Sequence, residues 1–220
     1  LTLLNFYKAY RAMVWAKISA IQAEPLAPHD PEARLYLKNL EAYLKLALSY
    51  QIQPKPQLTI TFGPSGCGKT TFTNQWILDN QAFRIRSDVV RKQMFQMKLD
   101  EPPEPDQKAK LYSENTTKQV YQTLCDEAHF LLKHQIPVLI DATCLKKWQR
   151  ELFLSLAHEH GVLFKILSFD YDEEQCRKRL LERQKHQDVS DADVAVFEKQ
   201  ISPLEPLSDI EKTYTQNIVI

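Results

Sequence analysis

Hydrophobic side chains recur at helical spacing along residues 1–50, in two stretches that prolines separate. The first stretch, Leu1 to Ile21, stops before Pro25. The second starts at Asp30, a suitable N-cap, with Pro31 at the first helical position. The apolar positions are Leu4, Tyr7, Val14, Ile18 and Ile21, then Leu37, Leu40, Leu44 and Leu48. The pattern predicts a helical hairpin whose stripes pack together over a core too small to fold alone.

A proline-containing linker, residues 51–57, precedes a different pattern over residues 58–220, where short apolar runs alternate with helical periodicity. The predicted strands are Leu58–Phe62, Phe83–Ile85, Val138–Ile140, Phe164–Phe169 and Asn217–Ile220. Strands joined by helices pair in parallel through right-handed crossovers. The sequence therefore predicts an α/β fold, a three-layer αβα sandwich with about five parallel strands that binds ligands at their carboxyl ends. The acidic stretch Glu101–Asp106 is predicted to be a surface loop.

Composition narrows the choice of partners only slightly. The chain carries 28 basic and 28 acidic residues, so its net charge does not attract long nucleic acid or an anionic membrane. The end of a nucleic acid is still a candidate partner. No apolar run reaches the ~20 residues that span a bilayer. The cysteines Cys67, Cys125, Cys144 and Cys176 are too widely spaced for a zinc or redox pair. We expect a reduced, cytoplasmic protein.

Residues Gly63–Thr70 match the phosphate-binding loop G-x-x-x-x-G-K-[ST] at every fixed position, between a predicted strand and a predicted helix. In such a loop, backbone N–H groups turn onto phosphate oxygens because glycines leave room. Lys69 is expected to reach the β- and γ-phosphates, and the Thr70 hydroxyl to hold Mg²⁺. The expected nucleotide-binding residues are Gly63, Pro64, Ser65, Gly66, Cys67, Gly68, Lys69, Thr70 and Thr71. The motif predicts ATP and Mg²⁺ as cofactors, with Cys67 as a spacer.

An acceptor for the phosphoryl group needs further side chains opposite the loop, and the first candidate follows the second predicted strand. Arg86, Ser87 and Asp88 stand directly after that strand. Asp88 is therefore expected at the strand's carboxyl end, where it could accept a proton from an acceptor hydroxyl. The alternative is that Ser87 or Asp88 is the N-cap of a helix predicted over Val89–Met97.

Two more groups are candidates. Asp141 ends the third strand, where a carboxylate could orient Mg²⁺ or substrate; the alternative is that it caps a helix beginning near Lys146. Arg179 and Arg183 lie four residues apart on one helix face, so both could close onto the phosphates. The alternative for this basic face is simple solvation.

Other polar residues are interpreted as structural. His186-Gln187-Asp188 resembles a protein-kinase catalytic loop only by chance, because Asp193 stands where that motif needs Asn. Ser190 with Asp193 is predicted to cap a helix over Ala192–Gln200. The histidines His129, His158 and His160 have no carboxylate or cysteine grouping that would predict a metal site. They are expected to be surface or packing residues.

Three elements together resemble a group of bacterial P-loop kinases, AAA-family ATPase-like proteins. They are Arg86 to Lys92, Asp141 to Thr143 and Ser190 to Asp193, and the similarity runs from Leu58 to about Leu207. The group is more remotely similar to zeta-toxin-like, polynucleotide and tRNA-modifying kinases, which implies a nucleoside-kinase-like fold. The resemblance implies Lys69, Asp88, Arg179 and Arg183 as catalytic residues. It implies Arg86, Asp88, Arg91 and Asp141 as acceptor-binding residues, with Thr70 and Asp141 on the metal.

The front end, from Leu4-Asn5-Phe6-Tyr7 to Ala16-Lys17, resembles the tail of an aminoglycoside-phosphotransferase-like domain. This resemblance implies that the chain begins inside a longer, bifunctional protein with such a domain fused upstream. The leading hypothesis is a kinase that transfers the γ-phosphate of ATP to a hydroxyl of an unidentified small molecule or nucleic-acid end. The alternative is a regulatory ATPase or nucleotide-binding switch for the fused domain.

Overall fold

The computed structural model describes the chain except for residues 1–2, 28, 51–54, 184–189, 191 and 220, and the side chains of residues 105, 106 and 183. The chain divides into two compact units, residues 1–54 and 55–220. Among the described residues, no helix combines the length and hydrophobicity needed to cross a bilayer.

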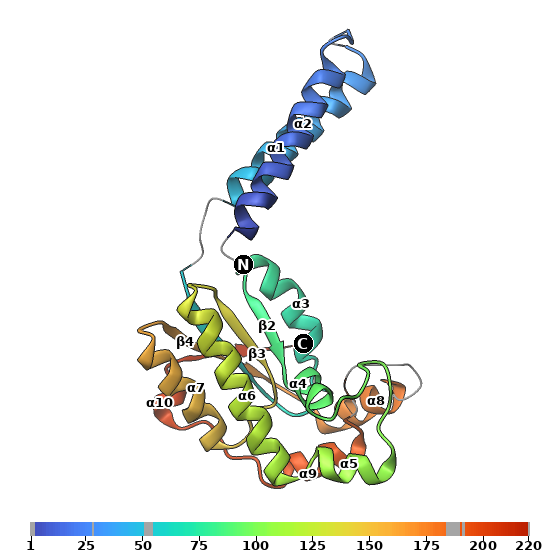
Figure 1. Cartoon of the computed structure of the whole chain (residues 1–220). Helices are drawn as coiled ribbons and strands as arrows, with labels where there is room; N and C mark the ends of the chain where they lie inside the picture. The colour runs from blue at the N-terminus through green and yellow to red at the C-terminus, as the bar shows by residue number, and fades with distance from the viewer. Residues whose placement is uncertain (1–2, 28, 51–54, 184–189, 191, 220) are drawn as a thin grey trace. The chain divides into compact units, whose positions relative to one another are not determined.

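The first unit is a pair of helices, α1 (Leu4–Ala23) and α2 (Pro31–Ser49), that run side by side (Figure 1). Asp30 is the N-cap of α2, as predicted, because its carboxylate accepts a hydrogen bond from the Glu32 N–H at 2.8 Å. The predicted apolar stripes are mostly exposed, and only Ile18 and Leu40 among them are half-buried. The buried side chains are small ones, Ala12, Ala16, Ser19, Ala33 and Ala47. Small residues let two helices approach closely, so larger side chains such as Tyr7, Leu37 and Leu48 remain exposed.

The second unit is built on a five-stranded parallel sheet in the order β2-β3-β1-β4-β5. The strands are β1 (Gln57–Phe62), β2 (Phe83–Arg86), β3 (Val138–Asp141), β4 (Leu163–Phe169) and β5 (Thr215–Ile218). The prediction of five parallel strands is confirmed. The fifth strand starts two residues before the predicted strand Asn217–Ile220, because Thr215 and Gln216 pair with Ile166 and Leu167 at the sheet edge.

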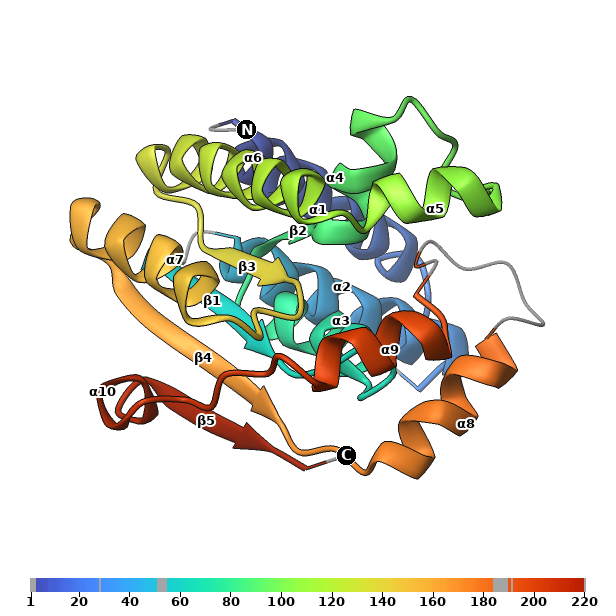
Figure 2. The same cartoon turned by 90° about the horizontal axis from the view of Figure 1, so that it is seen from below.

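Helices cover both faces of the sheet (Figure 2). They are α3 (Lys69–Asp79), α4 (Ser87–Met94), α5 (Pro105–Leu111), α6 (Glu114–Lys133), α7 (Lys147–Glu159), α8 (Glu173–Arg183), α9 (Val194–Ile201) and α10 (Asp209–Lys212). One core packs α6 and α7 against Leu58 and Ile60 of β1. The other packs α8 and α9 against Leu139 of β3 and Leu167 of β4, with α3 on the same side. The predicted three-layer sandwich is therefore confirmed.

Several predicted helix ends are wrong. The loop predicted over Glu101–Asp106 ends at Glu104, because Pro105 starts α5 at the proline-tolerant first position. The helix after β2 starts at Ser87 with Arg86 as its N-cap, so neither Ser87 nor Asp88 is the cap. The N-cap of α7 is Lys146, so Asp141 is not a cap either. The helix predicted over Ala192–Gln200 is α9, which Asp193 caps through the Val196 N–H at 2.9 Å.

Candidate functional site

The loops that follow β1 and β3 and the start of α4, which follows β2, meet α5, α8 and α9 around a cleft of about 1210 Å³. The connection from β1 leads past β3 to β2, whereas the connection from the adjacent β3 leads past β1 to β4, in the opposite direction. Connections that diverge in this way open a crevice at the carboxyl ends of β1 and β3. The predicted site residues that line the cleft are Ser65, Gly66, Gly68, Lys69, Thr70, Thr71, Arg86, Asp88, Arg91, Asp141 and Arg179. Gly63, Pro64 and Cys67 are buried beneath this surface. Residues from three separate strand ends therefore share one cleft.

The glycines of the loop after β1 set its conformation. Gly66 has a φ of +83°, and a Cβ there would lie 3.0 Å from the Cys176 carbonyl oxygen and 3.1 Å from Leu180 Cγ. Gly63 has a φ of +150°, and its Cβ would lie 3.0 Å from Cys67 Sγ. Any side chain at these positions would combine backbone strain with a collision. Glycine at position 66 therefore lets the loop pack against α8, and glycine at position 63 lets it pack against the end of β4.

Lys69 is the first residue of α3 and its ammonium is held by the loop itself. Lys69 Nζ donates to the carbonyl oxygens of Gly63 at 2.9 Å and Pro64 at 2.5 Å. The side chain is only 9% exposed. The positive end of the α3 dipole adds to this charge, so the loop is a strongly electropositive point at the floor of the cleft.

Gln200, a residue that the sequence did not single out, reaches this loop from α9. The Ser65 N–H donates to Gln200 Oε1 at 2.9 Å. Ser65 is one of the loop positions whose N–H groups are expected to face phosphate oxygens. The side-chain amide therefore uses a donor that an anion would need. No sequence signal marks Gln200, because its partner lies 135 positions away.

Asp141 and Thr70, the two predicted metal ligands, are in direct contact. Thr70 Oγ1 donates to Asp141 Oδ2 at 3.1 Å, and Arg86 Nε lies 3.7 Å from the same oxygen. Burial raises the pKa of Asp141 above its ordinary value, Lys69 and Arg86 lower it, and Asp88 raises it. A hydroxyl and a carboxylate are oxygen ligands of the kind that Mg²⁺ prefers. The residue types and their contact fit a magnesium site.

Asp88 lies in the first turn of α4, half-buried, and lines the cleft. Arg91, one turn further on, is 8% exposed and donates from Nη1 to the Leu111 carbonyl oxygen. Its guanidinium also lies 4.9 Å from the centre of the Tyr112 ring, while Nε has no hydrogen-bond partner within the described part of the chain. Arg91 therefore joins α4 to the end of α5 while it lines the cleft.

Two arginines of α8, Arg179 and Arg183, were predicted to cover the phosphates. Arg179 is exposed on α8 and lines the cleft. Arg183 is the last residue of α8, and its side chain lies outside the described residues. Arg177, on the same helix, instead pairs with Glu198 of α9 at 2.8 Å and with Glu173 at 3.0 Å. The basic stretch thus contains one residue that faces the cleft and one that ties α8 to α9.

An ion pair in the lining of the cleft connects α5 to the N-cap of α9. Lys108 Nζ of α5 lies 2.5 Å from Oδ2 of Asp193, the N-cap of α9, and both residues line the cleft. The sequence predicted Asp193 as a helix cap, which it is, but offered no role for Lys108, since α5 itself was not predicted. A side chain from each of two helices, far apart in the chain, therefore bridges the site.

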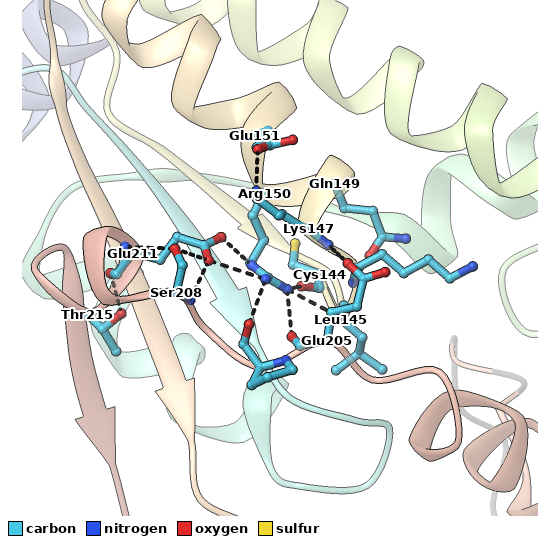
Figure 3. Close-up of polar contacts among 12 residues, drawn as sticks. Cys144, Leu145, Lys147, Gln149, Arg150, Glu151, Glu205, Ser208, Glu211 and Thr215 are labelled. Atoms are coloured by element: carbon cyan, nitrogen blue, oxygen red, sulfur yellow. Dashed lines mark hydrogen bonds and ion pairs between the residues drawn. The ribbon is translucent and has the colours of Figure 1, made fainter.

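Arg150 positions the loop between β3 and α7 from behind the cleft (Figure 3). Its side chain is 1% exposed, pairs with Glu211 at 2.5 Å, and donates to the carbonyl oxygens of Cys144 and Leu145, both at 3.1 Å. The Tyr121 hydroxyl accepts from the Cys144 N–H at 3.1 Å. This loop continues directly from Asp141. The ion pair was missed in the sequence because its partners lie 61 positions apart.

The cysteines near the site are not arranged as nucleophiles. In the described part of the chain all four are free thiols. Burial raises the pKa of Cys144 to about 12 and that of Cys176 to about 11. A thiol with so high a pKa stays protonated at neutral pH, so neither supplies a thiolate.

Comparison with known proteins identifies a family and structures of similar fold. A family model described as an AAA domain matches residues 58–207, the range over which the sequence resemblance was predicted. No curated protein matches the chain. The solved structures that resemble this chain include a gluconokinase from Sinorhizobium meliloti 1021, a sugar kinase from Janibacter sp. HTCC2649, and Chaetomium thermophilum Kti12 in complex with ADP-AlF3.

The likeness to these three is one of fold. The gluconokinase has a TM-score of 0.52 at 14% identity, covering 76% of this chain and 83% of its own. The sugar kinase has a TM-score of 0.52 at 18% identity, covering 76% of this chain and 85% of its own. Kti12 has a TM-score of 0.55 at 16% identity, covering 74% of this chain and 88% of its own. They confirm the predicted α/β P-loop kinase fold, whereas the predicted upstream phosphotransferase-like domain stays a prediction.

Proposed function

The chain belongs to the AAA-domain family, and on that premise we propose that it is an ATP-dependent kinase that phosphorylates a hydroxyl group of a second substrate. One observation carries the proposal. Asp88 and Asp141, from the ends of two neighbouring strands, share a cleft of about 1210 Å³ with the phosphate loop. Pockets for one drug-sized ligand hold roughly 300–1,000 Å³, so this cleft has room for a nucleotide and an acceptor together.

The nucleotide half of the reaction rests on the loop after β1. Backbone N–H groups of the loop and the N-terminus of α3 bind the phosphate oxygens, and Lys69 leaves its carbonyl partners to pair with the β- and γ-phosphates. Thr70 and Asp141 would hold Mg²⁺, which when bound neutralises charge on the β- and γ-phosphates. The pKa of Asp141 is already raised by burial, so the carboxylate gains from a cation beside it.

The acceptor half of the reaction rests on Asp88. Its carboxylate takes the proton of the acceptor hydroxyl, whose oxygen forms a bond to the γ-phosphorus while the bond from that phosphorus to the β–γ bridging oxygen breaks. ADP is the leaving group. Arg179, which is exposed and lines the cleft, would stabilise the charge on the transferred group, and Arg86 and Arg91, which also line the cleft, would bind the acceptor.

The test is phosphoryl transfer itself. Protein, γ-labelled ATP and Mg²⁺ are incubated with pooled nucleosides, sugars and short oligonucleotides, and both labelled product and free phosphate are followed. Wild type is compared with Asp88→Asn and with Asp100→Asn, a control at an exposed position that does not line the cleft. A labelled hydroxyl product is expected from wild type and Asp100→Asn, and about 10²–10⁴-fold less from Asp88→Asn. Equal transfer by Asp88→Asn would remove its role as base.

The contact between Ser65 and Gln200 supports a second function, a nucleotide-binding switch. Because Gln200 Oε1 accepts the Ser65 N–H, phosphate that takes this donor must displace the side chain and with it a tie to α9. Binding would thereby change how α9 is held, which is what a sensor of nucleotide needs. Release of free phosphate alone, at a rate that Asp88→Asn leaves unchanged, would favour this second function.

A further inference from the structure

A cluster of two histidines and a glutamate lies at the end of the second unit that is opposite the phosphate loop. His129 is on α6, Glu159 is the last residue of α7, and His160 is the C-cap of α7. His160 leads into β4 at Leu163, and so lies at the amino end of the strands, whereas the loop after β1 lies at their carboxyl end. α6 and α7 lie side by side on one face of the sheet (Figures 1 and 2). The prediction that these histidines lack a carboxylate grouping is therefore wrong.

The three potential ligand atoms face one another. His160 Nε2 lies 3.1 Å from His129 Nδ1, and His129 Nδ1 lies 3.6 Å from Glu159 Oε1. All three atoms lie within 4.8 Å of one another. Zinc bonds of 2.0–2.2 Å at tetrahedral angles place the ligand atoms roughly 3.3–3.6 Å apart. The two measured separations lie close to that range.

We propose that His129, Glu159 and His160 form a zinc site that is separate from the phosphotransfer site. Two imidazoles and one carboxylate are a ligand set that suits Zn²⁺, whereas Mg²⁺ and Ca²⁺ prefer oxygen atoms throughout. The side chains of His129 and Glu159 are 46% and 63% exposed, so an ion can enter from solvent. With three protein ligands, zinc keeps a position for water.

Charge around the cluster favours a cation. The cluster lies at the C-terminal end of α7, which is the negative end of the helix dipole. Cys125 lies one turn before His129 on α6, and its pKa is raised to about 11 by burial, then by the negative charges of Asp126 and Glu159. A divalent cation would offset this negative potential.

The site would join α6 to α7 rather than take part in the reaction. These helices belong to the same hydrophobic core, and each leads into a central strand, α6 into β3 and α7 into β4. An ion that binds side chains from both helices binds the folded state more tightly than the unfolded chain, and so raises the stability of the fold. The expected effect of zinc is a higher Tm.

Zinc binding is measured by competition with a chromophoric chelator, in excess Mg²⁺ to fill oxygen-only sites, and Co²⁺ absorption reports the coordination geometry. His129→Gln and His160→Gln are compared with wild type and with His158→Gln, an exposed neighbour on α7 that is outside the cluster. We expect one tight site per chain in wild type and His158→Gln, with tetrahedral Co²⁺ absorption. Affinity should fall by at least about 10–100-fold in the two cluster variants.

The Tm supplies a second readout. Zinc should raise the Tm of wild type and His158→Gln but not that of His129→Gln or His160→Gln. Zinc affinity that is the same in all four proteins, or that falls equally in His158→Gln, would overturn the proposal. Because the cluster lies away from the phosphate loop, neither result depends on kinase activity.

Discussion

Thr70 Oγ1 donates a hydrogen bond to Asp141 Oδ2 over 3.1 Å, joining the first turn of α3 to the end of β3. The bond brings together two residues that are 71 positions apart in the chain, both beside the ammonium of Lys69, whose charge lowers the pKa of the same carboxyl. If the proposed function holds, this pair is where the metal meets the phosphate loop. Replacing the carboxylate tests that pairing without changing its shape.

Asp141→Asn should reduce Mg²⁺-dependent nucleotide turnover by about 100-fold or more, because the amide cannot supply the negative charge that balances the metal. Turnover is measured across a Mg²⁺ titration, with Asp100→Asn as the control. Turnover by Asp141→Asn that equals wild type at every Mg²⁺ concentration would contradict the assignment.

The pH dependence of Mg²⁺ affinity should reflect the raised pKa of Asp141. Burial favours the protonated carboxyl, so at a given mildly acidic pH more of it is protonated than of an ordinary aspartate. Mg²⁺ must compete with that proton, and its apparent affinity should therefore begin to fall at a higher pH than an ordinary aspartate would allow. Mg²⁺ titrations of wild type and Asp141→Asn, from neutral pH down through the acid range, measure the effect. The same pH profile in both proteins would show that Asp141 does not bind the metal.

Lys69→Ala should abolish measurable nucleotide affinity, a loss of about 100-fold or more, because it removes the buried charge at the floor of the cleft. Binding of a fluorescent ATP analogue measures this loss. Lys98→Ala, at an exposed position that does not line the cleft, is the control and should bind as wild type does. Circular dichroism spectra of the variants should overlay, because the Lys69 ammonium bonds to the Gly63 and Pro64 carbonyl groups and the Cys67 thiol, all within its own loop.

Gln200→Ala should raise nucleotide affinity by roughly 2- to 10-fold, since one hydrogen bond of about 0.5–1.5 kcal/mol no longer competes for the Ser65 N–H. Gln122→Ala, an exposed glutamine on α6, is the matched control. A fall in affinity on removing Gln200 would mean that this side chain helps to bind the nucleotide instead of competing with it.

Glu211→Gln should destabilise the fold by about 3–5 kcal/mol, because it leaves the buried charge of Arg150 unpaired. Burial acts to raise the pKa of Glu211, but hydrogen bonds from Arg150 and Ser208 lower it below its ordinary value. A lowered folded-state pKa means that this stability is present above the unfolded-state pKa and is lost as pH falls through the folded-state pKa. Stability should therefore fall with pH in the acid range, and more steeply in wild type than in Glu211→Gln.

Urea denaturation at several pH values measures both effects. Glu151→Gln is the control, because Glu151 is about half-exposed and its ion pair with Lys147 lies on the surface. That variant should stay within about 0.5 kcal/mol of wild type. An equal loss in both variants would show that the buried pair does not stabilise the loop after β3.

Local patterns in the sequence predicted much of the fold. The apolar runs of β1 and β3 and the glycine spacing of the phosphate loop depend on neighbours only a few residues away, so they can be recognised without a structure. The start of β5 was missed because Thr215 and Gln216 are polar and lie outside the apolar run, although they pair with Ile166 and Leu167 of β4. The same holds for α5, whose proline and acidic residues looked like a loop.

The sequence by itself determined the phosphate loop, the parallel α/β fold and most of the candidate residues at the strand ends. Only the tertiary structure decided which of them meet: Thr70 with Asp141, Gln200 with Ser65, Arg150 with Glu211, and His129 with His160. Periodicity and motif spacing act along the chain, whereas these contacts depend on the strand order β2-β3-β1-β4-β5 and on how the helices pack over it. That order brings together residues between which the sequence carries no local signal, because the free energy of each contact appears only once the sheet has formed.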